Sequence, residues 1–467
     1  MLFTSAAFMF LFLPFVLAVY YLAPQRFRRH ILMAISVAFY ILVNWRTPWV
    51  IPMLFAAAAA AHFVGKWAEN TDRPHTYIEP ISCGAAVVLF VLLRVLVDSS
   101  AWFDFPFGSA VWLLSCVSYI CDVSRRDAEA GNIWDALQYV CFFPVMAAGP
   151  VIKYKDFRKY TDEVQFTVNN FSYGIKMFAL GAVERMAIAG VMIEAYEQII
   201  EKSNGSLDLF FGLLSAVCIC FAMYFAFAGW TDMGVGVAAM FGIRLERDVD
   251  GALWAYSPTR YFSRILKGLA SWIGDYVLPQ ITKLISTANT ALSRSLLSAL
   301  TVFCMAMWIK TSLAMLCVAS VMAIIVFVLE FSEAERLMSE SVGMRVIGFF
   351  LTFLLISLFW SAGVSESFGE FLRLLNGINL TAPDYNIYYV YMAMSGRLYI
   401  ITAAFAAVLA PVACFSHRIL DRFSDKTASV VEAVAVLLLL LLFAFTIVYY
   451  MPQYPQYAVR AFRYFVF

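Results

Sequence analysis

Apolar stretches of roughly 18 or more residues recur from end to end of this chain, and they restrict its fold more than any other feature. Each is long enough to cross a bilayer as a helix. Hydrophobic residues make up 63% of the 467 residues and charged residues 14%, which leaves too little polar surface for a soluble protein of this size. We therefore expect an integral membrane protein that crosses the bilayer many times.

A backbone in lipid must satisfy its own hydrogen bonds, so only helices or a closed barrel can span a membrane. Runs such as residues 434–448 lack the alternation of a barrel strand. We predict an all-α polytopic bundle with about 10–12 transmembrane or re-entrant helices and with interfacial amphipathic helices. No repeat or long hydrophilic region divides the chain, which indicates one domain over residues 1–467.

Charge predicts the topology of the first span. The apolar segment 6–22 has no basic residue before it and no cleavage site after it, which is typical of a retained span rather than a signal peptide. The basic residues at 26, 28 and 29 follow at once and place that loop in the cytoplasm and the N-terminus outside. The net charge is +1 and no basic stretch suggests nucleic acid.

The nine cysteines lie in or beside apolar segments without a C-x-x-C pair. They are typical of buried small hydrophobic residues, so neither a metal site nor a redox site is expected.

Residues 224–243, YFAFAGWTDMGVGVAAMFGI, combine small residues with one acid. Gly234 and Gly236 would let helices or a ligand approach the backbone closely. Asp232 lies beside apolar segments, and acids in that position usually face a bundle interior or an aqueous cavity. Two interpretations stay open for Asp232, a functional carboxylate and a hydrogen-bonded structural one.

Residues 261–277, YFSRILKGLASWIGDYV, lie in a polar interval that covers residues 244–295. Apolar residues from Leu266 to Leu284 recur at helical spacing with charges between them, which predicts an amphipathic helix at the membrane surface or across the bundle entrance. Pro279 is expected to kink or interrupt it. Two other regions are predicted to lie outside the hydrocarbon, residues 153–170 and a loop over 366–386. Residues 146–151 contain Gly149-Pro150 and are expected to form a short or re-entrant segment.

Residues 224–243 and 261–277, the first and second signature segments, resemble the membrane-bound O-acyltransferase family. The resemblance is to the branch that O-acetylates alginate and other exported polysaccharides. There the first segment reads YFDFSGYSDMAIG and the second roughly FWRRWHxSLSxWLRDYV. Ala226 and Ala228 replace the family's Asp and Ser. Residues 143–157 form a further specific match, and weaker matches lie in the family's order at residues 118–123, 181–185, 351–360 and 464–467.

The resemblance implies two histidines for acyl transfer, and both positions are apolar here. Leu266 stands at the histidine of the second segment, and Ile309 stands at that of a GLWHG-like segment matched by Ala306–Lys310. A leucine or isoleucine side chain neither accepts nor donates a proton, and a missing general base typically costs roughly 10²–10⁴ in rate. Whether the chain is an enzyme is therefore open.

Other groups could take the histidines' place. Of the four histidines, His62 is the one inside an apolar segment, where a structural role and a functional one both stay open. Asp232 and Asp275 are the candidate carboxylate bases. The resemblance also implies substrate contacts at Tyr224, Gly229, Asp232, Arg264 and Trp308.

Two functions remain in competition. The first is a degenerate relative in the bacterial inner membrane, a pseudoenzyme that acts as a partner component of a polysaccharide O-acylation or export system. Its expected partners are periplasmic O-acetylation proteins or a polysaccharide synthase or export complex. The second is an active O-acetyltransferase with a non-histidine base. It would take its acetyl group from acetyl-CoA or another cytoplasmic acyl thioester, with no bound cofactor. A transporter is a third class of function. The sequence shows neither the row of intramembrane charges nor the inverted repeats that would favour it.

Overall fold

A computed structural model describes the chain over residues 3–70, 77–99, 108–147, 149–162, 167–202, 207–284, 290–376, 378–379 and 425–452. Six helices in these ranges are long and apolar enough to cross a membrane, and four shorter helices are apolar. The two strands of the described part have two residues each and pair in parallel. The predicted all-α polytopic membrane fold is confirmed.

The first half of the described chain is almost entirely helical and ends with the long helix α11. In chain order its elements are η1 Ala7–Phe12, α1 Leu13–Leu22, α2 Gln25–Val43, α3 Val50–Glu69, α4 Ile78–Ser99, α5 Ser109–Ser124, α6 Ile133–Val140, α7 Phe143–Ala147, α8 Tyr154–Asp162, α9 Val168–Ala182, η2 Val183–Ala189, α10 Gly190–Lys202, β1 Leu207–Asp208 and α11 Leu209–Met240.

The second half follows a connection over residues 241–251. Its described elements are η3 Ala252–Trp254, α12 Pro258–Arg264, α13 Lys267–Trp272, η4 Ile273–Val277, α14 Leu278–Leu284, α15 Thr290–Ile309, α16 Leu313–Phe331, α17 Ala334–Glu340, α18 Val342–Val364, α19 Phe368–Asn376, β2 Ile378–Asn379, α22 Asp425–Phe445 and η5 Thr446–Tyr450. The predicted span near residue 403 and the aromatic C-terminus lie outside the described residues.

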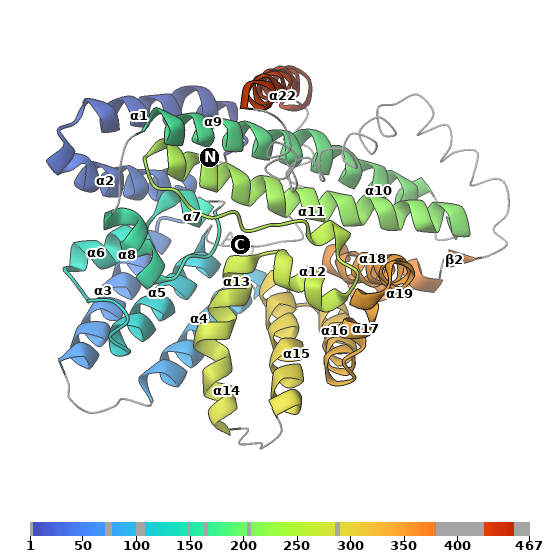
Figure 1. The fold of residues 1–467 in the computed structure, drawn as a ribbon. Coiled ribbons are helices and arrows are strands. Elements are labelled where there is room, and N and C mark those ends of the chain that lie inside the picture. Colours follow the sequence, from blue (N-terminus) through green and yellow to red (C-terminus); the bar gives the residue numbers. More distant parts are fainter. Residues whose placement is uncertain are drawn as a thin grey trace.

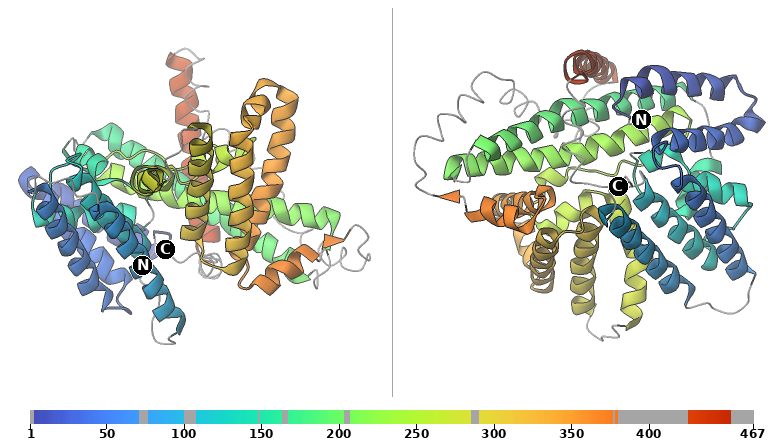
Figure 2. Two further views of the ribbon diagram at one scale, coloured as in Figure 1. Left: turned by 90° about the horizontal axis from the view of Figure 1, so that it is seen from below. Right: turned by 180° about the vertical axis from the view of Figure 1, so that it is seen from behind.

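Helix α11 and the continuous α9–η2–α10 rod run side by side across the molecule (Figures 1 and 2). In Figure 1 the helices α3 to α6 lie on one side below this pair and α15 to α19 on the other, with α13 and α14 between them. Helix α22 packs against α9 at the opposite edge. The first signature segment lies in α11 and the second in α12 to η4, so both meet near the centre of the molecule.

Glycines set how closely α9 and α11 approach. A Cβ atom on Gly229 would lie 2.5 Å from the carbonyl oxygen of Gly181, and one on Gly236 would lie 2.7 Å from that of Gly174. Both distances are far inside van der Waals contact. Gly234 meets the backbone of Gly149 in the same way, at 2.5 Å. The predicted close approach at Gly234 and Gly236 is confirmed, and its partners are α9 and the segment after α7.

The amphipathic helix predicted from Leu266 onward begins one residue later than expected. Leu266 has a left-handed backbone and precedes α13, so the chain breaks there between α12 and α13. The helical path then continues through the π-helical turn η4 and past Pro279 into α14, so Pro279 does not interrupt it. A π-helical turn is one of the local adjustments by which a helix accommodates such a break in its hydrogen-bond ladder.

The loop predicted for residues 366–386 is wrong over residues 368–376, which form α19. Phe368, Phe371, Leu372 and Leu375 have the spacing of one helix face, and Phe371 is buried. Of the residues that suggested a loop, Gly369 lies in the first turn of this helix, and Asn376 ends it. Whether residues 1–467 form one domain stays a prediction.

Candidate functional site

The turn at Leu266 is held by a loop that follows α11. The backbone of Leu266 has φ +54° and ψ +53°, a conformation that L-residues with large side chains rarely adopt. The amide of Lys267 donates to the carbonyl oxygen of Asp248 at 3.0 Å, and the amide of Asp250 donates to that of Arg264 at 3.0 Å. The connection after α11 therefore clamps the chain on both sides of the position that matches the family's histidine.

The side chain of Asp248 completes this clamp. Its Oδ1 accepts a hydrogen bond from the amide of Gly268 at 2.5 Å, inside the first turn of α13. Burial raises the pKa of the Asp248 carboxyl to about 6, against the opposing effects of the Gly268 amide and of Lys267. Asp248 is 3% exposed. Sequence reasoning missed it because an acid in the run RDVD is typical of a solvated loop.

The two positions that the resemblance assigns to the motif histidines lie in apolar packing. Leu266 and Ile309 are 5% and 1% exposed, and both belong to the continuous hydrophobic core. Ile309 ends α15, and the next residue, Lys310, is buried with its Nζ donating to the carbonyl oxygens of Gly363 and Ser365, each at 2.8 Å. That ammonium caps the end of α18. Neither the Leu266 nor the Ile309 side chain can itself accept or donate a proton.

The end of the second signature segment docks on α5. The hydroxyl of Tyr276 donates to Oδ1 of Asp122 at 2.7 Å and lies 2.9 Å from the hydroxyl of Ser118. The amide of Lys155 donates to Oδ2 of Asp122 at 2.8 Å. Three segments that carry the family resemblance, at 118–123, 153–157 and 275–277, therefore form one hydrogen-bonded network.

Asp275 belongs to the same network as an ion-pair partner. Its Oδ2 accepts hydrogen bonds from Nζ of Lys153 at 2.7 Å and of Lys155 at 3.1 Å. Burial acts to raise the pKa of Asp275, but the two lysines outweigh it and hold that pKa below its usual value. A general base for a hydroxyl needs the opposite shift, towards neutrality. The environment of Asp275 therefore suits an ion pair better than proton abstraction.

Asp232 is fully buried in α11 and is bound by Arg247 from the loop that follows. The guanidinium contacts both carboxylate oxygens, with Nε to Oδ1 at 3.1 Å. In such a bidentate pair both carboxylate oxygens are occupied by the guanidinium. Ala228 and Ala226, about one and two helical turns before Asp232, are buried as well. This geometry supports the structural interpretation of Asp232.

His62 is buried in α3 and contacts one tyrosine. Its Nδ1 lies 2.9 Å from the hydroxyl of Tyr119, and that hydroxyl donates its proton to the carbonyl oxygen of Ala130 at 2.6 Å. Nδ1 must then carry the hydrogen of the His62–Tyr119 bond. His62 thus has the hydrogen-bonded structural surroundings that one of its two interpretations requires. His75 and His417 lie outside the described residues.

The expected substrate contacts lie on three helices of the described chain. Tyr224 and Gly229 are buried in α11, Arg264 ends α12 and Trp308 lies in α15. No group of three or more metal-binding side chains occurs in the described part of the chain, and the eight cysteines described there are free.

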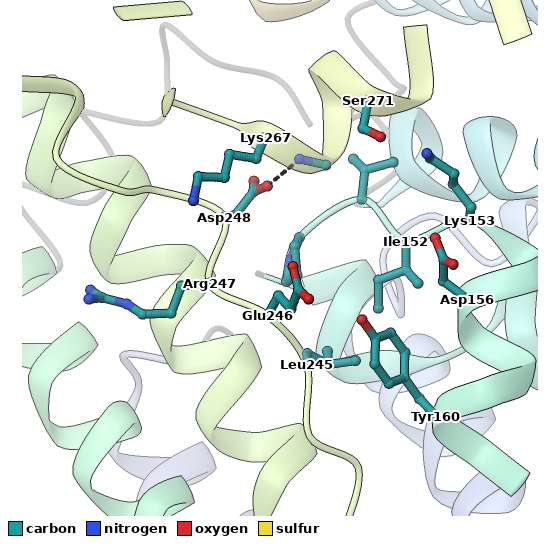
Figure 3. A pocket seen from close by; sticks show the side chains of 13 residues that line it. Ile152, Lys153, Asp156, Tyr160, Leu245, Glu246, Arg247, Asp248, Lys267 and Ser271 are labelled. Carbon is teal, nitrogen blue, oxygen red and sulfur yellow. Dashed lines mark hydrogen bonds between the residues drawn. The ribbon is translucent and has the colours of Figure 1, made fainter. Parts of the chain in front are cut away.

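A cavity of about 280 Å³ lies instead beside the clamp around Leu266 (Figure 3). It opens where the segment after Gly149, helix α8, the loop after α11 and helix α13 meet. The residues that line it are Pro150, Val151, Ile152, Lys153, Asp156, Tyr160, Leu245, Glu246, Arg247, Asp248, Lys267, Gly268 and Ser271. None of the substrate contacts implied by the resemblance is among them.

Comparison with known protein sequences identifies the family that the chain resembles. A sequence model of the membrane-bound O-acyltransferase family matches residues 37–326. A probable alginate O-acetylase, AlgI, of Pseudomonas fluorescens is 29% identical over 293 residues, which are 59% of this chain and 56% of that protein. The chain thus spans little more than half the length of this relative.

Two more distant relatives cover shorter parts. A peptidoglycan O-acetyltransferase of Helicobacter pylori is 23% identical over 31% of this chain and 28% of its own length. A teichoic acid D-alanyltransferase of Lacticaseibacillus rhamnosus is 24% identical over 34% of this chain and 42% of its own length.

Proposed function

Because the chain belongs to the membrane-bound O-acyltransferase family, we propose that it serves a bacterial polysaccharide O-acylation or export system as a member without histidine-based acyl transfer. Its role there is to bind or assemble the other components. The expected partners are periplasmic O-acetylation proteins or a polysaccharide synthase or export complex. We place it in the inner membrane with its N-terminus in the periplasm, in accord with the basic residues at 26, 28 and 29.

The observation that carries this proposal is the apolar packing at the two motif positions. Leu266 and Ile309 are almost fully buried in the hydrophobic core. A sugar hydroxyl is a poor nucleophile near neutral pH without a base, and neither side chain can act as one. The candidate replacements do not meet the requirement either, because Asp232 is bound by Arg247 and Asp275 by two lysines.

An acyl-transfer assay tests the proposal. The full chain, purified in lipid nanodiscs, is incubated with acetyl-CoA and with longer acyl thioesters, in the presence of alginate or other oligosaccharide acceptors. We expect thioester loss and product formation at the rate of empty nanodiscs, while a histidine-containing member of the family turns over in the same assay. Turnover above that background would overturn the proposal.

One carboxyl favours the competing function, an active O-acetyltransferase that moves an acetyl group from a cytoplasmic thioester to an exported polysaccharide or carrier protein. Asp248 combines a pKa raised to about 6 by burial with a place beside the Leu266 turn. If the assay shows turnover, an Asp248→Asn variant distinguishes a carboxylate base from other routes, since the asparagine keeps the acceptor for the Gly268 amide but cannot take a proton.

A further inference from the structure

The charged side chains that line the cavity beside the Leu266 turn differ in whether they form ion pairs. Its lining contains three cationic side chains, Lys153, Arg247 and Lys267. Each is bound to a carboxylate that does not line the cavity. These pairs are Lys153 with Asp275 at 2.7 Å, Lys267 with Asp250 at 3.0 Å and Arg247 with Asp232. In Figure 3, Arg247 and the ammonium of Lys267 extend away from Ile152 and Tyr160 on the opposite wall.

Of the three carboxylates of the lining, Asp156 pairs with Lys159 at 3.8 Å, whereas Asp248 and Glu246 make no ion pair within the described residues. The second oxygen of Asp248, which is not the acceptor for Gly268, has no hydrogen-bond partner among the described residues. Glu246 likewise makes no ion pair or hydrogen bond within the described part of the chain, and it stands at the exposed rim. The cavity therefore has a buried anionic floor at Asp248 and an anionic rim at Glu246.

The remaining polar groups can take part in hydrogen bonds with a ligand. Burial raises the pKa of the Tyr160 hydroxyl, and the neighbouring carboxylates of Glu246 and Asp156 raise it further, so the hydroxyl stays neutral and can donate. The exposed hydroxyl of Ser271 lies on the α13 side. These carboxylates do not converge as metal ligands, since no metal-binding cluster occurs in the described residues.

We propose that this cavity binds a primary ammonium group carried on a small polar body, with Asp248 as the buried anchor and Glu246 at the rim. A volume of about 280 Å³ is just below the range of about 300–1,000 Å³ typical for drug-sized ligands. It therefore suits a single sugar ring or an amino-acyl group. The ammonium would supply the donors that the free oxygen of Asp248 lacks, in a charge-assisted hydrogen bond. This inference does not rest on the proposed function, because it needs no acyl transfer.

Matched probes test the ligand chemistry. Binding of D-glucosamine, D-glucose and N-acetyl-D-glucosamine to the full chain in nanodiscs at pH 7.5 is measured by calorimetry or ligand-detected NMR. Glucosamine carries the ammonium, glucose has a hydroxyl in its place, and the acetylated sugar has a neutral amide. Alanine amide forms a fourth arm that separates an amino-acyl body from a sugar. We expect glucosamine or alanine amide to bind about tenfold more tightly than either neutral sugar.

Variants locate the site. Glu246→Gln, at an exposed rim position, and Asp248→Asn should each weaken binding of the ammonium probe about tenfold. Glu340→Gln, an exposed change in α17, should leave it unchanged. The inference is overturned if no probe binds, if the neutral sugars bind as well as glucosamine, or if both cavity variants retain full affinity. Acyl-transfer activity in the thioester assay would overturn the proposed function and leave this result untouched.

Discussion

The α9–α11 crossing and the surroundings of Leu266 and Ile309 belong to the same family scaffold. They differ in which of the family's features they contain. At the crossing, Gly181 and Gly229 still permit backbone contact at distances that no other residue allows. At the two motif-histidine positions, leucine and isoleucine fill the core. Packing that positions the helices is present, while groups that would move a proton are absent from the two matched positions. In the proposed function, this packing serves the assembly of the bundle and not histidine-based acyl transfer.

Loss of the Asp232–Arg247 ion pair should lower the stability of the helix scaffold more than any other change proposed here. Removing the guanidinium in Arg247→Ala leaves a fully buried carboxylate without its counter-charge, which typically costs about 3–5 kcal/mol. We expect a large fall in the thermal unfolding midpoint in nanodiscs. Arg336→Ala, which removes only exposed pairs at 3.8 and 3.9 Å, is the control. Equal midpoints for the two variants would contradict the role given to Arg247.

Asp248, at the Leu266 turn, should make the stability of the protein depend on pH. Its carboxyl has a pKa of about 6 against a usual 3.8, so the folded state holds its proton more tightly than the unfolded state. The resulting stabilisation is present below about pH 4 and is lost as the pH rises through 6, by up to roughly 3 kcal/mol. Asp248→Asn should remove this slope and be more stable than the unchanged protein at pH 7.5. Parallel stability–pH curves for the two proteins would refute this account of Asp248.

A single methyl group tests the glycine crossing. Gly229→Ala would bring a Cβ to 2.5 Å from the carbonyl oxygen of Gly181 in α9 and to 2.7 Å from the amide nitrogen of Arg185 in η2. Overpacking of this kind typically costs about 1–3 kcal/mol. The matched control is Gly84→Ala in α4, where nothing lies within 4 Å and alanine is the better helix former. Chemical or thermal unfolding should show Gly229→Ala well below Gly84→Ala. The crossing would not be close-packed if the order were reversed.

Asp275 should show the smallest effect and the opposite sign from Asp248. Lys153 and Lys155 hold its pKa below the usual value, so its stabilisation is present above that value and is lost as the pH falls towards the folded-state pKa. Its side chain is 36% exposed, and ion pairs with such access to solvent contribute less than about 1 kcal/mol. Asp275→Asn should lower stability slightly at pH 7.5 and not below pH 3. A gain in stability at pH 7.5 would show that burial dominates instead.

The helical membrane fold and the glycine contacts could be predicted because both follow from local composition and spacing. Apolar runs require spans, and Gly234 and Gly236 matter only if something approaches them. The break at Leu266 could not be predicted, because the apolar periodicity begins at Leu266 itself and a left-handed leucine has no local signal. Asp248 was missed for a related reason. Its carboxylate is held by the amide of Gly268, which is distant in sequence, and no pattern in the run RDVD indicates that contact.

Access of a water-soluble reagent to the motif positions tests the central claim most directly. Leu266→Cys, Ile309→Cys and, as an accessible control on α13, Ser271→Cys are treated with a charged maleimide in nanodiscs, and labelling above that of the unchanged protein is measured. If apolar side chains close the two positions, Ser271→Cys labels quickly while Leu266→Cys and Ile309→Cys label only after unfolding. Labelling of the two motif positions at the rate of Ser271→Cys would show a water-filled passage there and would contradict the account.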